Sequence, residues 1–268
     1  MHWVVDWIAN LPVSVAVLLA LAGGGAVSAI GLLGLNRILP HPIRSTHNDV
    51  SGFILAIVGV IYAVLLAFIA VAVWQDFAQV DNLVQTEANL VGDLYRDTAA
   101  LPDPTASALR DSVFVYAEVV VQDEWPALAA GRTDDAAGWQ LLDRFHSELV
   151  NFHSTDPGVS TMQADMVRTL NQLYDARRGR FHAAIAALPA ILWWNLLVGA
   201  VILMLFTYLF GVPHLLMHVS MVSLLGALIG VVLLLIVLLS NPFRGRSHVS
   251  VDPFNQLVRS VETMSYPH

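Results

Sequence analysis

Residues 47–68 read HNDVSGFILAIVGVIYAVLLAF, a polar triplet of His47, Asn48 and Asp49 followed by an apolar run without a charged residue. The run continues to Trp74 and exceeds the ~20 residues that a helix needs to cross a hydrocarbon core. This stretch therefore predicts a transmembrane helix with three polar side chains at its start.

The composition places the whole chain in the membrane class. Of its 268 residues, 56% are hydrophobic and 13% are charged, whereas soluble domains carry about 25% charged residues. The chain has no cysteine, and its thirteen basic residues are all arginine. Disulfides, thiol catalysis and lysine Schiff-base chemistry are therefore excluded. The net charge of −8 gives no electrostatic basis for binding nucleic acid.

Three further apolar runs are long enough to span a bilayer, and they cover Leu11–Leu35, Ala190–Phe210 and Val219–Leu239. With Val50–Trp74 they predict four transmembrane helices. We interpret the first run as a retained span and not as a signal peptide, because Asp6 stands where a signal peptide carries positive charge.

The long segment between the second and third spans is richer in acidic residues and has helical patterns between its turns. Apolar side chains beyond Trp74 recur at steps of three and four, which predicts that the second span continues as one helix to about Thr98. Further helices are expected over Thr105–Ala129 and Asp134–Asn151. A fourth should open at the Asp156-Pro157 pair and run toward Pro189.

The predicted fold class is an all-α membrane protein, with a helical cytoplasmic domain inserted between the second and third of four transmembrane helices. The expected domains are an N-terminal pair of spans (1–74), the inserted domain (75–187), a C-terminal pair of spans (188–241) and a cytoplasmic tail (242–268). The positive-inside rule favours cytoplasmic termini. The arginines on the side of the insert are Arg177, Arg178, Arg180, Arg244 and Arg246, against Arg37 and Arg44 in the first loop.

The polar triplet allows two interpretations. Asn48 or Asp49 is a suitable N-cap for the apolar helix. Alternatively, His47 and Asp49 belong to an ion-facing vestibule. His41, His47 and Asp49 are possible metal ligands by type, but they lack a recognisable ligand spacing, so no metal site and no cofactor are predicted.

The second span has two different faces. Gly and Ala residues recur along one side from Gly52 to Ala70, which favours close helix packing. A bulky stripe on the other side is a candidate pore lining that gates by dewetting. It consists of Phe53, Ile57, Ile61, Val64 and Phe68. In the last span, Gly226 and Gly230 form a GxxxG match that supports helix packing.

The remaining polar signals are interpreted as structural or interfacial. Arg177, Arg178 and Arg180 are expected to form an interfacial basic patch that meets anionic lipid. Arg244 and Arg246 are expected at headgroup level after Pro242 ends the fourth span, and the alternative is a ligand or lipid site there. The Glu124-Trp125-Pro126 segment is interpreted as a buried aromatic anchor at a helix end.

Several motifs resemble the bacterial bestrophin-like domain family of unknown function. They are His47-Asn48-Asp49-x-x-Gly52, Glu87, Leu94-Tyr95-Arg96, Tyr116, Glu124-Trp125 and Pro242-Phe243-x-Gly245. The family is distantly similar to bestrophins, which are pentameric anion channels. The Pro242-Phe243 pair is similar to part of their calcium clasp, but Arg244 interrupts the motif and its acidic run is missing. The resemblance therefore implies no calcium site.

No catalytic motif is present, so the chain is not expected to be an enzyme. The favoured function is an oligomeric ion channel with the second transmembrane helix lining the pore. The alternative is a membrane-anchored helical sensor or scaffold without transport activity. The expected partners are the lipid bilayer, inorganic ions and further copies of the chain, a pentamer by resemblance only. The expected location is the bacterial cytoplasmic (inner) membrane.

Overall fold

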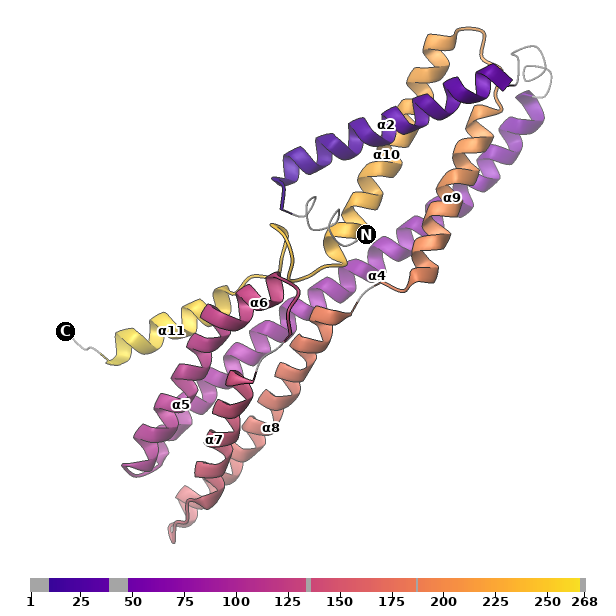
Figure 1. The fold of residues 1–268 in the computed structure, drawn as a ribbon. Coiled ribbons are helices and arrows are strands. Elements are labelled where there is room, and N and C mark those ends of the chain that lie inside the picture. Colours follow the sequence, from indigo (N-terminus) through magenta and orange to yellow (C-terminus); the bar gives the residue numbers. More distant parts are fainter. Residues whose placement is uncertain (1–9, 39–47, 134–135, 187, 266–268) are drawn as a thin grey trace. The chain divides into compact units, whose positions relative to one another are not determined.

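The computed structural model describes residues 10–38, 48–133, 136–186 and 188–265, and all regular structure within these ranges is helical (Figure 1). The elements are α2 (Val13–Ile38), α4 (Asn48–Asp97), the 3-10 turn η1 (Thr98–Ala100), α5 (Thr105–Val119), the π-helical turn η2 (Val120–Glu124), α6 (Trp125–Ala129), α7 (Ala137–Asn151), α8 (Pro157–Ile185), α9 (Ala190–Tyr208), α10 (Leu215–Leu239) and α11 (Asp252–Ser265). The prediction of an all-α fold is confirmed for the described residues.

Four helical segments are long and apolar enough to cross a membrane. They lie in α2, in α4, in the stretch that ends at Tyr208 and in α10. The predicted extension of the second span is also confirmed, because α4 is one helix of 50 residues that ends at Asp97. The Asp156-Pro157 pair opens α8 as predicted, and the backbone N–H of Gly158 donates to Asp156 Oδ1 at 2.7 Å.

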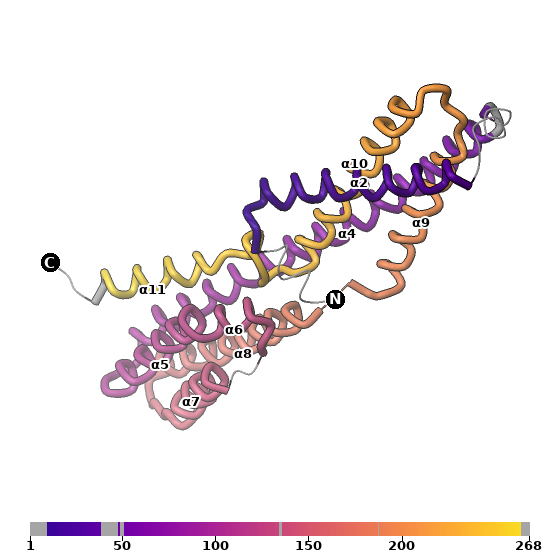
Figure 2. The backbone as a smooth tube through the Cα atoms, turned by 45° about the horizontal axis from the view of Figure 1, so that its top comes forward, coloured from indigo at the N-terminus to yellow at the C-terminus, as the bar shows by residue number. Residues whose placement is uncertain are grey.

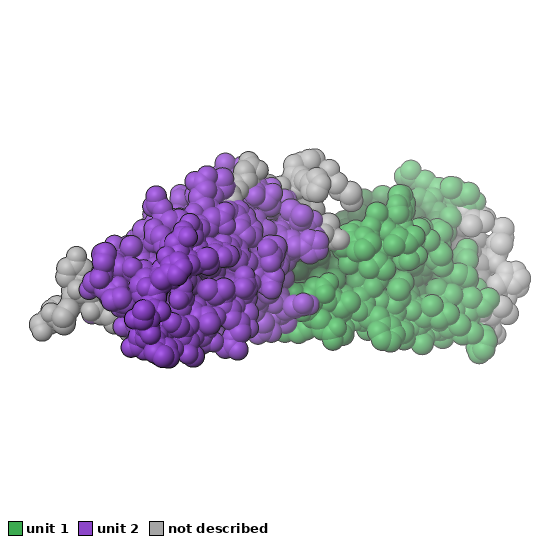
Figure 3. All heavy atoms as spheres, turned by 90° about the horizontal axis from the view of Figure 1, so that it is seen from below, with its two compact units in different colours: residues 1–76, 187–241, 245–247 green, residues 77–186, 242–244, 248–268 purple. Residues whose placement is uncertain are grey.

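The chain divides into two compact units, which are coloured separately in Figure 3. Unit 1 contains residues 1–76, 187–241 and 245–247, and unit 2 contains residues 77–186, 242–244 and 248–268. Unit 1 therefore holds the apolar spans, and unit 2 holds the predominantly polar helices.

In unit 1, α2 and α10 pack backbone to backbone through small residues. A Cβ atom built on Gly226 would lie 1.8 Å from Ser28 Oγ and 2.5 Å from the carbonyl oxygen of Gly24. A Cβ atom on Gly230 would lie 2.6 Å from the carbonyl oxygen of Ala20. The interpretation of the GxxxG match as a packing motif is thus confirmed, since only glycine allows this approach.

In unit 2, the part of α4 beyond residue 76 runs beside α5 and α8 (Figures 1 and 2), and α7 packs on α5 and α8. The last helix, α11, packs on α5 and buries Phe254 and Val261. This helix lies in the segment that was expected from the sequence only as a tail. Its signal was present in the Asp252-Pro253 start and the apolar spacing after it.

Candidate functional site

The outward face of α4 within unit 1 is the first candidate site. The predicted pore-lining side chains are all exposed: Phe53 (72%), Ile57 (48%), Ile61 (65%), Val64 (49%) and Phe68 (72%). They share one side of the helix because successive residues turn by about 100°. The opposite side buries Tyr62, Ile69 and Val73 against α9 and α10.

Contacts with α9 fix the buried side of α4. The Tyr62 hydroxyl donates to the carbonyl oxygen of Leu196 at 3.1 Å, and its ring lies over Gly199, where a Cβ atom would be 2.5 Å from the ring. Part of the small-residue stripe is not used within the chain, because Ala63 and Ala67 are exposed. The outward side of α4 thus combines bulky and small apolar residues.

The start of α4 is tied to the connection between α9 and α10. The Asn48 carboxamide donates from Nδ2 to the Gly211 carbonyl oxygen at 3.0 Å, and its Oδ1 accepts from the Gly211 backbone N–H at 2.9 Å. This pairing is a role that neither the helix-cap nor the vestibule interpretation included. His47 and the side chain of Asp49 lie outside the described residues, so their predicted roles stay predictions.

The second candidate site is a cluster of buried charges inside unit 2. Glu87 comes from α4, Tyr116 from α5, Glu124 from η2, and Arg177 and Arg180 from α8. Each residue is at most 2% exposed. Three of the five (Glu87, Tyr116 and Glu124) belong to motifs that carried the family resemblance.

Hydrogen bonds link all five side chains of this buried charge cluster. Arg177 Nη1 donates to both carboxylate oxygens of Glu124, at 2.8 and 2.9 Å, and to the Tyr116 hydroxyl at 3.1 Å. Arg180 donates to Glu87 from Nε at 2.6 Å and from Nη2 at 3.0 Å, and Nη2 also reaches Glu124 at 2.5 Å. The Tyr116 hydroxyl in turn donates to Glu87 Oε1 at 2.6 Å.

The cluster pairs its buried side chains of opposite charge. Two carboxylates balance two guanidinium groups, so no net charge is buried. Burial alone would lower the pKa of Arg180, but the carboxylates of Glu87 and Glu124 outweigh burial and raise it above its ordinary value. Burial, together with the charge of Glu87, raises the pKa of Tyr116 well above its ordinary value, so its hydroxyl remains a donor.

The prediction of an interfacial basic patch is wrong for Arg177 and Arg180, because their fully buried side chains cannot meet lipid headgroups. The two residues are three positions apart on α8 and therefore share its inner side. Arg178 points away from them and forms an exposed ion pair with Asp175 at 2.6 Å. Arg177 and Arg180 thus lie in the protein interior, whereas Arg178 lies at the surface.

The arginines after α10 have protein contacts of their own. The Arg244 guanidinium lies against Gly131, where a Cβ atom would be 2.2 Å from Nη2. Arg246 Nε donates to the carbonyl oxygen of Asn10 at 3.2 Å. Whether either residue also meets lipid headgroups stays a prediction.

A π-helical turn positions Glu124. The turn η2 interrupts the helix between α5 and α6, and such turns place one extra residue in a helical stretch. Trp125 comes directly after the turn and is buried, as predicted for an aromatic anchor, with its ring edge-on to Phe243 at a centroid distance of 5.5 Å.

The Pro242-Phe243 segment belongs to the core of unit 2. Phe243 is 2% exposed, and the Val249 N–H closes the loop by donating to the Pro242 carbonyl oxygen at 2.7 Å. Among the described residues, no group of three or more His, Asp or Glu side chains is placed to hold a metal ion. The burial of Phe243 and the closed loop contribute to the packing of unit 2.

Comparisons with known proteins agree with the motifs. A family model described as Bestrophin-like domain matches residues 25–254, whereas no curated protein matches. A crystal structure of a bacterial bestrophin homologue from Klebsiella pneumoniae has a TM-score of 0.64 at 16% identity and covers 94% of this chain and 99% of that chain.

Two more solved structures are similar to this chain over nearly its whole length. A point variant of a Klebsiella pneumoniae bestrophin homologue has a TM-score of 0.62 at 15% identity, covering 92% of this chain and 99% of that chain. A structure described as a membrane protein has a TM-score of 0.66 at 15% identity, covering 93% and 98%. At these identities the structures show a shared fold, whereas the family model spans most of the sequence. The chain is therefore a membrane protein of the bestrophin-like family.

Proposed function

We propose that the chain assembles as a homo-oligomeric ion channel and that the exposed face of α4 lines its pore. The observation that carries this proposal is the exposure of Phe53, Ile61 and Phe68 on one side of α4 while the other side is packed on α9. The family supports the proposal, since the bestrophins that it resembles are pentameric anion channels. Exposed small residues such as Ala63 would allow neighbouring subunits to approach closely.

In such an assembly, the copies of each exposed side chain from all subunits form a ring around the pore axis. Rings of bulky apolar side chains form constrictions that gate by dewetting, because water leaves a narrow apolar pore. Phe68 and Ile61 are among the most exposed bulky residues of this face. They are therefore the proposed narrow rings.

Serine substitutions at these rings test the proposal. In reconstituted vesicles, Ile61→Ser and Phe68→Ser should raise ion flux on the order of tenfold, which corresponds to lowering the barrier by about 1.4 kcal/mol. The reason is that a polar ring stays wet. The matched control is Ile30→Ser on α2, because Ile30 is 68% exposed and Ile61 is 65% exposed. This control should leave flux at the wild-type level.

Two outcomes count against the channel. Flux at the empty-vesicle level in the wild type and in all variants would favour the membrane-anchored sensor or scaffold. A single chain by mass in mild detergent would contradict the assembly. Opposed chloride and potassium gradients in the same vesicles distinguish anion from cation selectivity through the reversal potential.

The orientation of the chain is proposed from its arginines, with both termini and unit 2 in the bacterial cytoplasm. A reporter inserted in the turn after Gly131 and another fused after His268 should both report cytoplasm. A reporter inserted near Thr46 should report the opposite side. A periplasmic signal from the Gly131 insertion would reverse the proposed orientation.

A further inference from the structure

The second half of α4 exposes a polar surface opposite the side that packs in unit 2. Between Phe77 and Gly92, every exposed residue of this helix is polar and uncharged. Four of these residues recur at steps of three and four, so they form one row on the helix surface. We call this row the polar stripe, and it consists of Gln79, Asn82, Thr86 and Asn89.

The polar stripe continues the face of α4 that we assign to the pore. Thr86 follows Phe68 by eighteen residues, which is five turns of an α-helix, and Gln79 follows Phe68 by eleven residues, which is about three turns. Because α4 is one helix of 50 residues, both parts share one side of it. The exposed side chains on that side change from bulky and apolar in unit 1 to polar and uncharged in unit 2.

We propose that the polar stripe lines a water-filled continuation of the pore and contacts permeating ions of either sign. This inference rests on the proposed channel. A carboxamide offers N–H donors to an anion and a carbonyl oxygen to a cation, whereas rings of charged side chains select ions by sign. A stripe of uncharged polar side chains therefore admits both kinds of ion, and one charge placed in it sets the selectivity.

The side chains of the stripe are placed to meet water and ions. Thr86 Oγ1 donates to the backbone carbonyl oxygen of Asn82 at 2.8 Å, a bond that leaves the Asn82 carboxamide exposed to solvent. The exposed surface of α8 differs, because it carries charged pairs such as Asp175 and Arg178. In a chain with a net charge of −8, an exposed helix side without charge is a distinctive property of α4.

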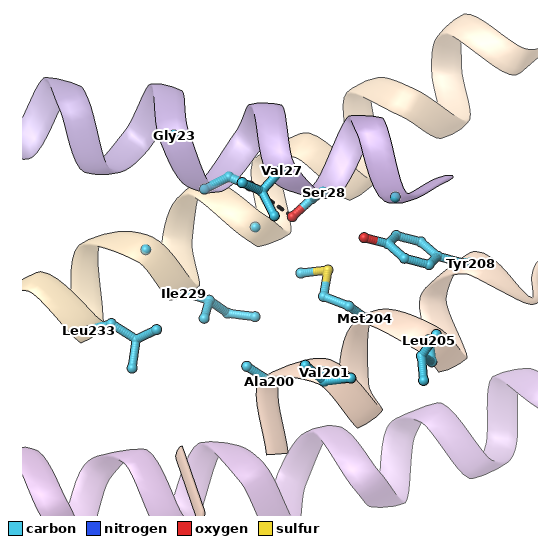
Figure 4. Close-up of a pocket in the computed structure, with 14 residues that line it drawn as sticks. Gly23, Val27, Ser28, Ala200, Val201, Met204, Leu205, Tyr208, Ile229 and Leu233 are labelled. Carbon is cyan, nitrogen blue, oxygen red and sulfur yellow. Dashed lines mark hydrogen bonds between the residues drawn. The ribbon is translucent and has the colours of Figure 1, made fainter. Parts of the chain in front are cut away.

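The apolar groove between α2, α9 and α10 in unit 1 offers ions no comparable contacts (Figure 4). Its side chains are apolar apart from those of Ser28 and Tyr208, and the Ser28 hydroxyl donates to the Gly24 carbonyl oxygen at 2.8 Å. Among the described residues, none from α4 lines this groove. An apolar surface cannot replace the water that an ion gives up, so the exposed side of α4 is the better candidate for ion contact.

Two asparagines of unit 2 allow a matched test. Asn82 lies in the polar stripe, Asn171 lies on α8, and both are exposed, so neither substitution removes a packed side chain. The chain has no cysteine, and Asn82→Cys and Asn171→Cys therefore each introduce a single thiol. Sulfonatoethyl and trimethylammonium-ethyl thiosulfonate reagents then attach a negative or a positive charge at that thiol on every subunit.

The measurement is the ratio of chloride to potassium permeability in reconstituted vesicles. For Asn82→Cys, we expect the positive reagent to raise this ratio and the negative reagent to lower it, each on the order of tenfold, because a ring of charges concentrates counter-ions. For Asn171→Cys, both reagents should leave the ratio unchanged. Asn82→Arg and Asn82→Asp repeat the test without reagents and should shift the ratio in the same two directions.

The possible failures are distinguishable. Ion flux with an unchanged permeability ratio in the modified Asn82→Cys protein, or with equal changes at both positions, would overturn this inference and leave the channel proposal intact. Flux at the empty-vesicle level in the wild type and in every variant would overturn the channel proposal and this inference together.

Discussion

Arg180→Met should lower the melting temperature of the folded protein by on the order of 10 °C or more, whereas Arg178→Met should leave it nearly unchanged. Arg180 balances the buried carboxylates of Glu87 and Glu124, and it is 0% exposed. Removing one partner of a buried ion pair costs about 3–5 kcal/mol, because an uncompensated charge is left behind. For a domain of this size, each kcal/mol corresponds to several degrees in melting temperature.

Arg178 is a matched control because it lies on the same helix, two positions away. Its ion pair with Asp175 is solvent-exposed, with side chains 61% and 75% accessible, and such pairs contribute about 0–1 kcal/mol. Adding Glu87→Gln to Arg180→Met should recover part of the loss, because one buried charge is removed. Unfolding is monitored by fluorescence while the protein is heated. Equal melting temperatures for the two single variants would argue against a stabilising role for the cluster.

Gly226→Val should prevent α2 and α10 from packing and should strongly reduce the yield of folded protein. The first added carbon would lie 1.8 Å from Ser28 Oγ and 2.5 Å from the Gly24 carbonyl oxygen. Overpacking a core usually costs about 1–3 kcal/mol, and the cost is at the upper end or beyond when backbone atoms must move. The measurement is the fraction of protein recovered as one sharp size-exclusion peak, together with its melting temperature.

Gly34→Val is the control for this second substitution. Gly34 also lies in α2, but a Cβ atom there meets nothing within 4 Å. The control carries the same added volume and the same backbone restriction, so it separates the clash from the general effect of replacing glycine in a helix. A Gly226→Val protein as stable as Gly34→Val would mean that the two helices do not approach as described.

Much of the helical architecture could be predicted because it depends on local periodicity. The apolar steps beyond Trp74 carry α4 to Asp97, and the Asp156-Pro157 pair starts α8. The Gly226–Gly230 spacing also indicated close packing, although the sequence does not name the partner helix. Each of these signals lies within a few residues of the feature that it predicts.

The buried charge cluster could not be predicted in this way. The run Arg177-Arg178-Gly179-Arg180 resembles a surface patch when it is considered alone. Its environment depends on Glu124 and Glu87, which lie 53 and 93 residues earlier in the chain. A buried guanidinium group without a partner is strongly destabilising, so the burial of these arginines requires the two carboxylates, and their meeting is a property of the tertiary fold.

The π-helical turn from Val120 to Glu124 makes the chain sensitive to the loss of a single residue at this point. A π-turn holds one more residue than the α-turn it replaces, so deleting one residue there would rotate α6 by about 100° relative to α5. Trp125 and Phe243 would then lose their edge-on contact. The extra residue of the turn is therefore needed to hold Trp125, directly after Glu124, against Phe243.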